Sequence, residues 1–87
     1  MKLYYFNPNN WGAQYFVMAE NKIEAHEHLL QYFEKLIDDP KEKTYKYAHK
    51  AELKRWKKVN PDNPYTFPEG YTLDEFEKGQ IIESEIA

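Results

Sequence analysis

The chain of 87 residues contains no cysteine, one serine and three glycines. The lack of cysteine excludes disulfide bridges, thiolate metal ligands and thiol nucleophiles. Ser84, the only serine, has no histidine near it in sequence. Gly12, Gly70 and Gly79 stand too far apart to form a glycine-rich phosphate loop. We therefore predict that the protein is not an enzyme and uses no cofactor.

Long apolar runs are also missing. No stretch approaches the roughly 20 apolar residues that cross a bilayer. The opening Met1–Phe6 meets Asn7-Pro8 too early to supply the core of a signal peptide. A chain this short buries only about 60% of its unfolded surface, which disfavours a deep catalytic cleft. We expect a single domain, residues 1–87, that lies in the cytoplasm and binds no membrane.

The clearest pattern that is present is an amphipathic helix over Asn21–Ile37. Asn21 stands at the N-cap position and Glu24 follows three residues later, as in a capping box. Asp39-Pro40 ends the segment, because proline disfavours helical geometry in the residue before it. One half of the helical wheel is apolar and is predicted to be buried. It contains Ile23, Ala25, Leu29, Leu30, Tyr32, Phe33, Leu36 and Ile37.

Two extended segments precede this helix. Lys2–Phe6 and Ala13–Glu20 flank a cluster of turn residues and predict a β-hairpin. In the second segment Tyr15, Val17 and Ala19 alternate with Gln14, Phe16 and Met18, and neither face is plainly polar. One face is expected to pack on the helix. The other face then needs a cover or a partner, for which a homodimer is one solution.

The remainder of the chain completes a small α+β fold. Lys41–Val59 predicts a second helix, and the proline-rich Asn60–Thr72 predicts an irregular loop pinned by its aromatic residues Tyr65, Phe67 and Tyr71. Leu73–Glu77 is either extended or a turn, and Gln80–Ile86 predicts the last strand. The order β-β-α-α-β favours a two-layer sandwich with a three-stranded, largely antiparallel sheet of order 2-1-3 and both helices on one face. A small helical domain with a loosely attached hairpin is the alternative.

Charge is distributed unevenly along the chain. Residues 1–40 carry a net charge of −3, residues 41–60 carry +6 and residues 61–87 carry −6. In the predicted second helix one arc is mostly apolar, with Tyr45, Ala48, His49, Leu53, Trp56 and Val59. The opposite arc gathers Lys43, Lys46, Lys50, Lys54, Lys57 and Lys58, with Tyr47 among them. The helix is therefore predicted to expose an almost purely cationic side.

Three interpretations of the cationic arc remain open. In the first, the arc is solvated or is paired within the molecule to Glu24, Glu27, Glu34 or the acidic C-terminal third. In the second, it binds nucleic-acid phosphates. In the third, it binds an acidic protein surface. Trp11 stands at the predicted hairpin tip, where it is either an exposed aromatic side chain of the kind that is frequent in binding sites or folds back over the open face of the sheet. The candidate partner-binding residues are Lys43, Lys46, Tyr47, Lys50, Lys54, Lys57 and Trp11.

The histidines do not form a metal-binding pattern. His26 and His28 are two residues apart on a helix and point in different directions, whereas helical ligand pairs need a spacing of three or four. His26 lies on the apolar arc, where a buried imidazole satisfied by one hydrogen bond is the expected role. His49 is in the analogous position on the second helix, which leaves two alternatives open, in which the histidines pair or one of them supplies a base. We predict no metal site.

The opening KLYYFNPNNWGAQYFVMAENKIEA and the ending KGQIIESE resemble segments of small accessory proteins encoded by bacteriophages and other mobile elements. Anti-CRISPR proteins belong to this group. The resemblance covers about a third of the chain and leaves out the cationic helix. It implies a protein that acts in the host cell cytoplasm by binding a bacterial defence complex and blocking it.

These observations lead to two hypotheses about function. The first is a non-enzymatic interaction protein, an inhibitor of the anti-CRISPR or another anti-defence type, that binds a bacterial protein or nucleoprotein complex and blocks it sterically. The alternative is a small nucleic-acid-binding module that uses the lysine-rich helix 41–59.

Overall fold

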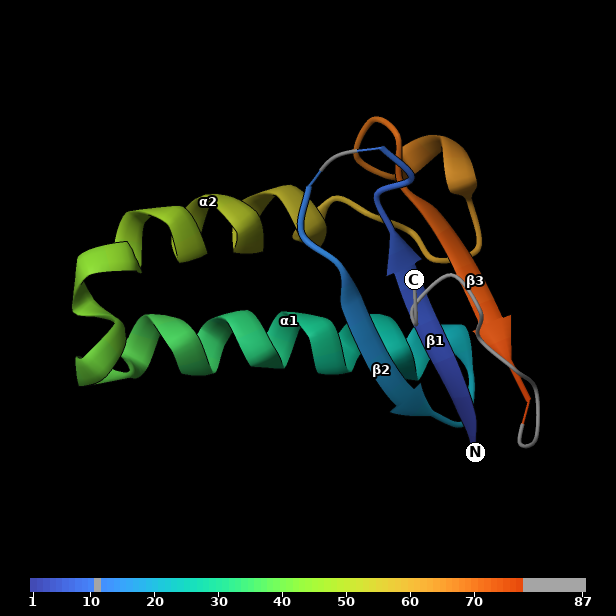
Figure 1. Cartoon of the computed structure of the whole chain (residues 1–87), viewed down its shortest axis with the longest axis horizontal. Helices are drawn as coiled ribbons and strands as arrows, with labels where there is room; N and C mark the ends of the chain where they lie inside the picture. The colour runs from blue at the N-terminus through green and yellow to red at the C-terminus, as the bar shows by residue number, and fades with distance from the viewer. Residues whose placement is uncertain (11, 78–87) are drawn as a thin grey trace.

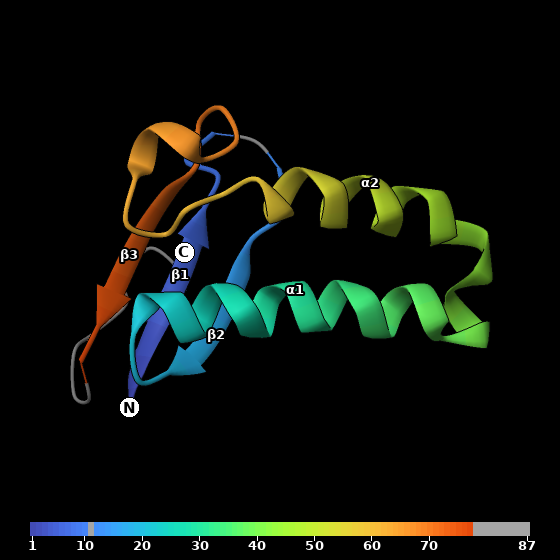
Figure 2. The same ribbon diagram turned by 180° about the vertical axis from the view of Figure 1, so that it is seen from behind.

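The computed structural model describes residues 1–10 and 12–77. The strands form one three-stranded sheet. Figure 1 shows two layers, with the helices against one face of this sheet, and Figure 2 shows the helices from behind. The predicted α+β sandwich with the order β-β-α-α-β is thereby confirmed. The elements are β1 (Lys2–Asn7), β2 (Tyr15–Ala19), α1 (Lys22–Asp38), the 3-10 helix η1 (Pro40–Tyr45), α2 (Lys46–Lys57), the 3-10 helix η2 (Pro64–Thr66) and β3 (Thr72–Phe76).

The sheet has the order β2-β1-β3, and both pairings are antiparallel. Tyr4 of the central strand lies opposite Val17 of β2 and Glu75 of β3. The strand order matches the prediction, but the strand beside β1 is Thr72–Phe76. It overlaps Leu73–Glu77, for which the sequence left an extended segment or a turn open. Its acidic residues weaken the strand signal in the sequence. The predicted last strand, Gln80–Ile86, lies outside the described residues.

The core joins the hairpin to both helices. Tyr4 and Phe6 from β1 are buried with Trp56 from the end of α2, and the Phe6 and Trp56 rings meet edge to face at 5.4 Å. The central strand of the sheet is therefore part of the core. This excludes the alternative of a helical domain with a loosely attached hairpin.

Helix α1 begins where its cap predicts. The Asn21 side-chain oxygen accepts a hydrogen bond of 2.9 Å from the backbone N–H of Glu24. The buried residues of α1 are Ala25, His26, Leu29 and Phe33. Ile23 and Tyr32 were predicted to be buried, but both are exposed, because one sheet and one neighbouring helix cover less of the circumference than the apolar arc suggests.

The second helix starts later than predicted. Residues 40–45 form a 3-10 turn capped by the Asp39 side chain, which accepts from the N–H of Lys41 at 2.9 Å. Glu42 leaves helical geometry inside this segment with φ −96° and ψ 15°. Tyr45, with φ −103° and ψ 12°, is the N-cap of the α-helix, which therefore begins only at Lys46. The predicted apolar arc is correct for the buried Trp56 and Val59 at the end nearest the sheet. Tyr45 and Ala48, at the other end, are exposed.

The loop between α2 and β3 is held by some of its aromatic residues. Tyr71 is buried and its hydroxyl donates to the backbone oxygen of Ala13 at 2.7 Å, while Phe67 packs against the core. Tyr65 was predicted to pin the loop, but it is almost fully exposed in η2. Asn9 lies in the left-handed region at φ 66°, and its side-chain N–H donates to the backbone oxygen of Gly70. This hydrogen bond links the loop to the β1–β2 hairpin.

The helical layer is wider than the sheet. The strands cross the N-terminal half of α1, and the rest of α1 extends past β2 together with η1 and most of α2 (Figures 1 and 2). An α-helix of this length spans about 25 Å, whereas three strands cover only about 14 Å. We call the uncovered part the projecting hairpin. No helix in the described parts of the chain is long and apolar enough to cross a membrane.

Candidate functional site

The predicted cationic arc is present as a continuous surface. We call it the lysine face, and it consists of Lys43 in η1 and Lys46, Lys50, Lys54, Lys57 and Lys58 along α2 and its C-cap. All six side chains are exposed. Within residues 1–10 and 12–77, none of them forms an ion pair with a carboxylate.

Acidic residues that were candidate partners of the lysine face lie elsewhere. Asp62 pairs with Lys22 at 3.2 Å, and Glu75 and Glu77 lie 3.7 and 3.5 Å from the ammonium group of Lys2. The charge of Glu75, and to a smaller extent that of Glu77, raises the pKa of the Lys2 ammonium group. Pairing inside the described part of the molecule therefore leaves the lysine face uncompensated.

The helix dipole accounts for only one end of this face. Lys54 and Lys57 lie in the last turn of α2, where a cation interacts favourably with the helix C-terminus. Lys46 is the first residue of α2 and Lys43 precedes it, at the end where a cation is disfavoured. The stability of the fold does not explain the lysines at this end.

Two aromatic residues were predicted to bind partners together with the lysines. Tyr47 follows Lys46 in α2 and is 87% exposed, so its ring is available beside the ammonium groups. Trp11 lies outside the described residues. The structure thus brings Lys43, Lys46, Tyr47, Lys50, Lys54 and Lys57 together on η1 and α2.

The histidines serve different local contacts. His26 is buried, and its Nε2 lies 2.8 Å from the backbone oxygen of Trp56, as expected for an imidazole satisfied by one hydrogen bond. His49 lies 3.2 Å from the Glu42 carboxylate, so these contacts do not support pairing between the two histidines. In the described parts of the chain no cluster of three or more histidine or acidic side chains is arranged to hold a metal ion.

One polar cluster was not anticipated from the sequence. The Glu52 carboxylate accepts from the Tyr15 hydroxyl at 3.0 Å, from the Trp56 indole at 3.1 Å and from Arg55 at 3.0 Å. Burial, and secondarily the Glu52 charge, raise the pKa of Tyr15. The spacing of four between Glu52 and Trp56 gives a sequence signal, but the contact with Tyr15 depends on the tertiary fold. The cluster joins β2 to α2.

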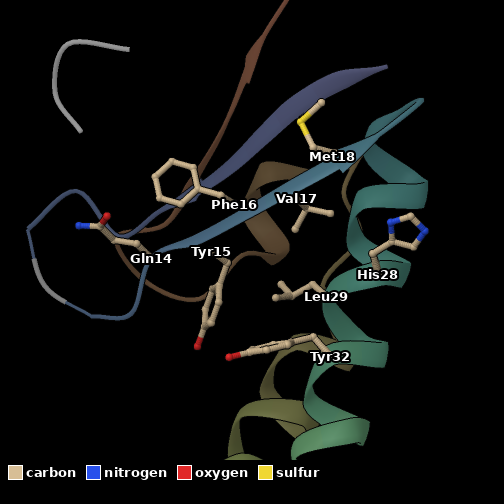
Figure 3. A pocket seen from close by; sticks show the side chains of 8 residues that line it. All are labelled: Gln14, Tyr15, Phe16, Val17, Met18, His28, Leu29 and Tyr32. Carbon is tan, nitrogen blue, oxygen red and sulfur yellow. The ribbon is translucent and has the colours of Figure 1, made fainter. Parts of the chain in front are cut away.

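A groove runs between β2 and α1, at the edge of the sheet where the projecting hairpin begins. Its volume is about 550 Å³. Figure 3 shows the side chains that line it, from Gln14, Tyr15, Phe16, Val17 and Met18 on the strand side and His28, Leu29 and Tyr32 on the helix side. Tyr15 and Tyr32 lie at one end, with their ring centroids 6.5 Å apart.

The groove lining is mostly apolar and aromatic. Among the described residues that line it, none carries a carboxylate, an amine or a thiol, and His28, which is exposed and whose Nε2 lies 3.9 Å from the Glu24 carboxylate, supplies an imidazole. Tyr32, predicted to be buried, is half-exposed and forms part of the wall. The groove was not predicted from the sequence. The predicted strand order could have indicated it, because that order makes β2 an edge strand beside α1.

Comparison of the chain with protein-family models, curated proteins and solved structures finds no match. Functional proposals for this chain therefore depend on its own surfaces.

Proposed function

We propose that this chain acts by binding rather than by catalysis, and that its lysine face docks on an acidic surface of a bacterial protein or nucleoprotein complex. The observation that carries the proposal is the row of six exposed lysines with no ion-pair partner among the described residues. A partner with clustered carboxylates would supply the missing counter-charge.

The energetic reason lies in the spacing of the lysines. Successive members from Lys43 to Lys57 are three or four residues apart, so neighbouring ammonium groups repel. Each such pair costs about 0.2–0.5 kcal/mol in an isolated helix. An acidic partner would convert this repulsion into attraction and would steer the encounter.

Inhibition would follow from shape. Much of the lysine face lies on the projecting hairpin (Figure 1). Docking through the lysine face would place the rest of the domain across the partner's surface. The resemblance to proteins of bacteriophages and other mobile elements adds the proposed setting, a bacterial defence complex in the host cytoplasm.

The first experiment is an affinity pull-down from bacterial lysate, with and without nuclease, followed by identification of the bound proteins. A partner retained after nuclease treatment and lost with the Lys46→Glu, Lys50→Glu, Lys54→Glu triple variant is the expected result. The variant should keep the melting temperature of the parent protein. Undiminished capture by a folded triple variant would contradict the role of the lysine face.

A matched pair of single substitutions separates the lysine face from net charge. Lys50 lies on this face, and Lys35 is an exposed lysine of α1 that also has no ion-pair partner among residues 1–10 and 12–77. Lys50→Glu and Lys35→Glu change the net charge equally. Only Lys50→Glu is expected to weaken capture of the partner.

Nucleic acid is the second candidate, and the exposed Tyr47 ring among the lysines favours it because such rings stack on unpaired bases. This function predicts an affinity that falls steeply with salt, with a logarithmic slope of about −0.7 per contacted phosphate of a single strand. It also predicts that Tyr47→Ala weakens binding and that nuclease empties the pull-down. A flat salt response would exclude it.

A further inference from the structure

We propose that the groove between β2 and α1 binds one extended, uncharged segment of a partner protein, which pairs with β2 as a fourth strand of the sheet. This site is separate from the lysine face. It is also the place where the sheet ends before the helical layer does (Figures 1 and 2).

The backbone of β2 supplies the pairing groups. As an edge strand, β2 pairs with β1 on one side only. Alternate residues of an edge strand direct their N–H and C=O groups away from the sheet, ready to pair with another strand. Within residues 1–10 and 12–77 no other strand pairs with this edge.

The side chains of the two sheet edges differ. Strand β3 carries Asp74 and Glu75, charges of the kind that keep an edge from pairing with other chains. Strand β2 reads YFVMA and has no charge, and its outward-facing Phe16 and Met18 are 44% and 51% exposed. Only the β2 edge therefore has the composition of a pairing surface.

The helix beneath the groove determines the side chains that fit. A strand added beside β2 would lie over the projecting part of α1, about 4.8 Å from β2. Its inward side chains would meet Tyr15, Leu29 and Tyr32, and its outward ones would flank Phe16 and Met18. The inward side chains enter the groove and must be apolar, whereas the outward ones only lie beside the exposed Phe16 and Met18. The segment therefore needs apolar residues at every second position, and no charge, over about five positions.

A second copy of this chain does not fit the position. Two copies related by a two-fold axis pair their β2 strands antiparallel, with the axis perpendicular to the shared sheet. Both helical layers then lie on the same side of that sheet, where the projecting hairpin of each copy occupies the space of the other (Figure 1). A single extended segment has no helical layer and avoids this collision.

The test begins with a phage-displayed library of random linear dodecapeptides selected on the full chain. We expect enriched peptides with apolar residues at every second position over about five residues. On binding, alternate backbone amides of β2 should become protected from hydrogen exchange. Single N-methyl groups along the peptide should lower affinity at least about tenfold at alternate positions, since each removes one main-chain hydrogen bond.

Matched variants locate the site. Tyr32→Asp should weaken peptide binding at least about tenfold, because it places a charge in the apolar wall. Tyr65→Asp, at an exposed tyrosine of η2, and Lys50→Glu, on the lysine face, should leave peptide affinity unchanged. The last variant makes a failure of the groove distinguishable from a failure of the lysine face.

Several outcomes would overturn the proposal. One is peptide affinity that changes neither with N-methylation nor with Tyr32→Asp. A second is a selection that enriches no alternating apolar pattern. A third is a stable dimer, detected by light scattering, that Met18→Lys dissociates. Peptide binding by a variant that ends at Glu77, when the full chain binds none, would assign the groove to the chain's own C-terminal segment.

Discussion

The imidazole Nε2 of His26 lies 2.8 Å from the backbone carbonyl oxygen of Trp56 and joins the first turns of α1 to the last turn of α2. A carbonyl oxygen only accepts, so Nε2 must carry the proton that is shared. Both residues are buried, and the Trp56 ring packs against Phe6 of the central strand. The His26–Trp56 contact links α1 directly to the helix that carries the lysine face.

His26→Ala is expected to lower the free energy of unfolding by about 1–3 kcal/mol, because it removes a buried hydrogen bond and its packing. The control is His28→Ala, two residues along the same helix and exposed, which should change stability by no more than about 0.5 kcal/mol. Urea denaturation followed by circular dichroism measures both. Equal effects of the two substitutions would contradict a structural role for the His26 contact.

The N-cap of α1 gives a second prediction. Asn21→Ala should cost about 1 kcal/mol, since the N–H of Glu24 loses its side-chain acceptor. In a domain of this size the melting temperature should fall by about 4–8 °C. Asn21→Ser keeps an acceptor at the same place and should retain most of the stability. A serine variant as unstable as the alanine variant would show that the cap is not the cause.

Glu52 is expected to matter more than its partly exposed position suggests. Glu52→Ala leaves the Tyr15 hydroxyl and the Trp56 indole without their acceptor, and it should cost about 2 kcal/mol or more. Combining it with Tyr15→Phe removes one orphaned donor, so the double variant should be more stable than the sum of the single effects implies. Strictly additive free energies would count against the Tyr15–Glu52 hydrogen bond.

Tyr15 and Tyr71 predict how stability responds to alkaline pH. Burial, followed by the Glu52 charge, raises the pKa of both phenols in the folded protein. A group that binds its proton more tightly when folded contributes stability below its unfolded pKa, near 10, and loses that contribution as pH rises further. Denaturation at a series of pH values should therefore show a decline above about pH 10. Tyr15→Phe should make this decline shallower, and an unchanged slope would contradict the assignment.

Neighbouring aromatic residues of α1 should respond very differently to truncation. Phe33 is 2% exposed and meets the Tyr15 ring edge to face at 5.3 Å, so Phe33→Ala should cost about 3–5 kcal/mol. Tyr32 is 49% exposed in the groove wall, so Tyr32→Ala should cost less than half as much. Thermal unfolding of both variants measures the difference. Similar losses would mean that Tyr32 belongs to the core rather than to a binding surface.

The local sequence determined the first helix, the β-hairpin before it and the end of the second helix. The Asn21 cap, the period of α1, the proline-rich break after α2 and the alternation of Tyr15, Val17 and Ala19 are each encoded within a few neighbouring residues. Short-range steric and hydrogen-bonding rules act at that distance. For the same reason the lysine face was predictable residue by residue, because it depends only on spacing along one helix.

Tertiary structure decided which apolar residues are covered. Tyr32 lies on the apolar arc of α1 but remains exposed, since the sheet is narrower than the helical layer that it crosses. Ile23 lies on the same arc and is exposed because the sheet and the neighbouring helix cover only part of the circumference of α1. The Tyr15–Glu52 hydrogen bond and the pairing of β3 with β1 join residues far apart in the chain, so no local sequence pattern predicts them. The groove has the same origin, because it exists only where the three-stranded sheet ends above α1.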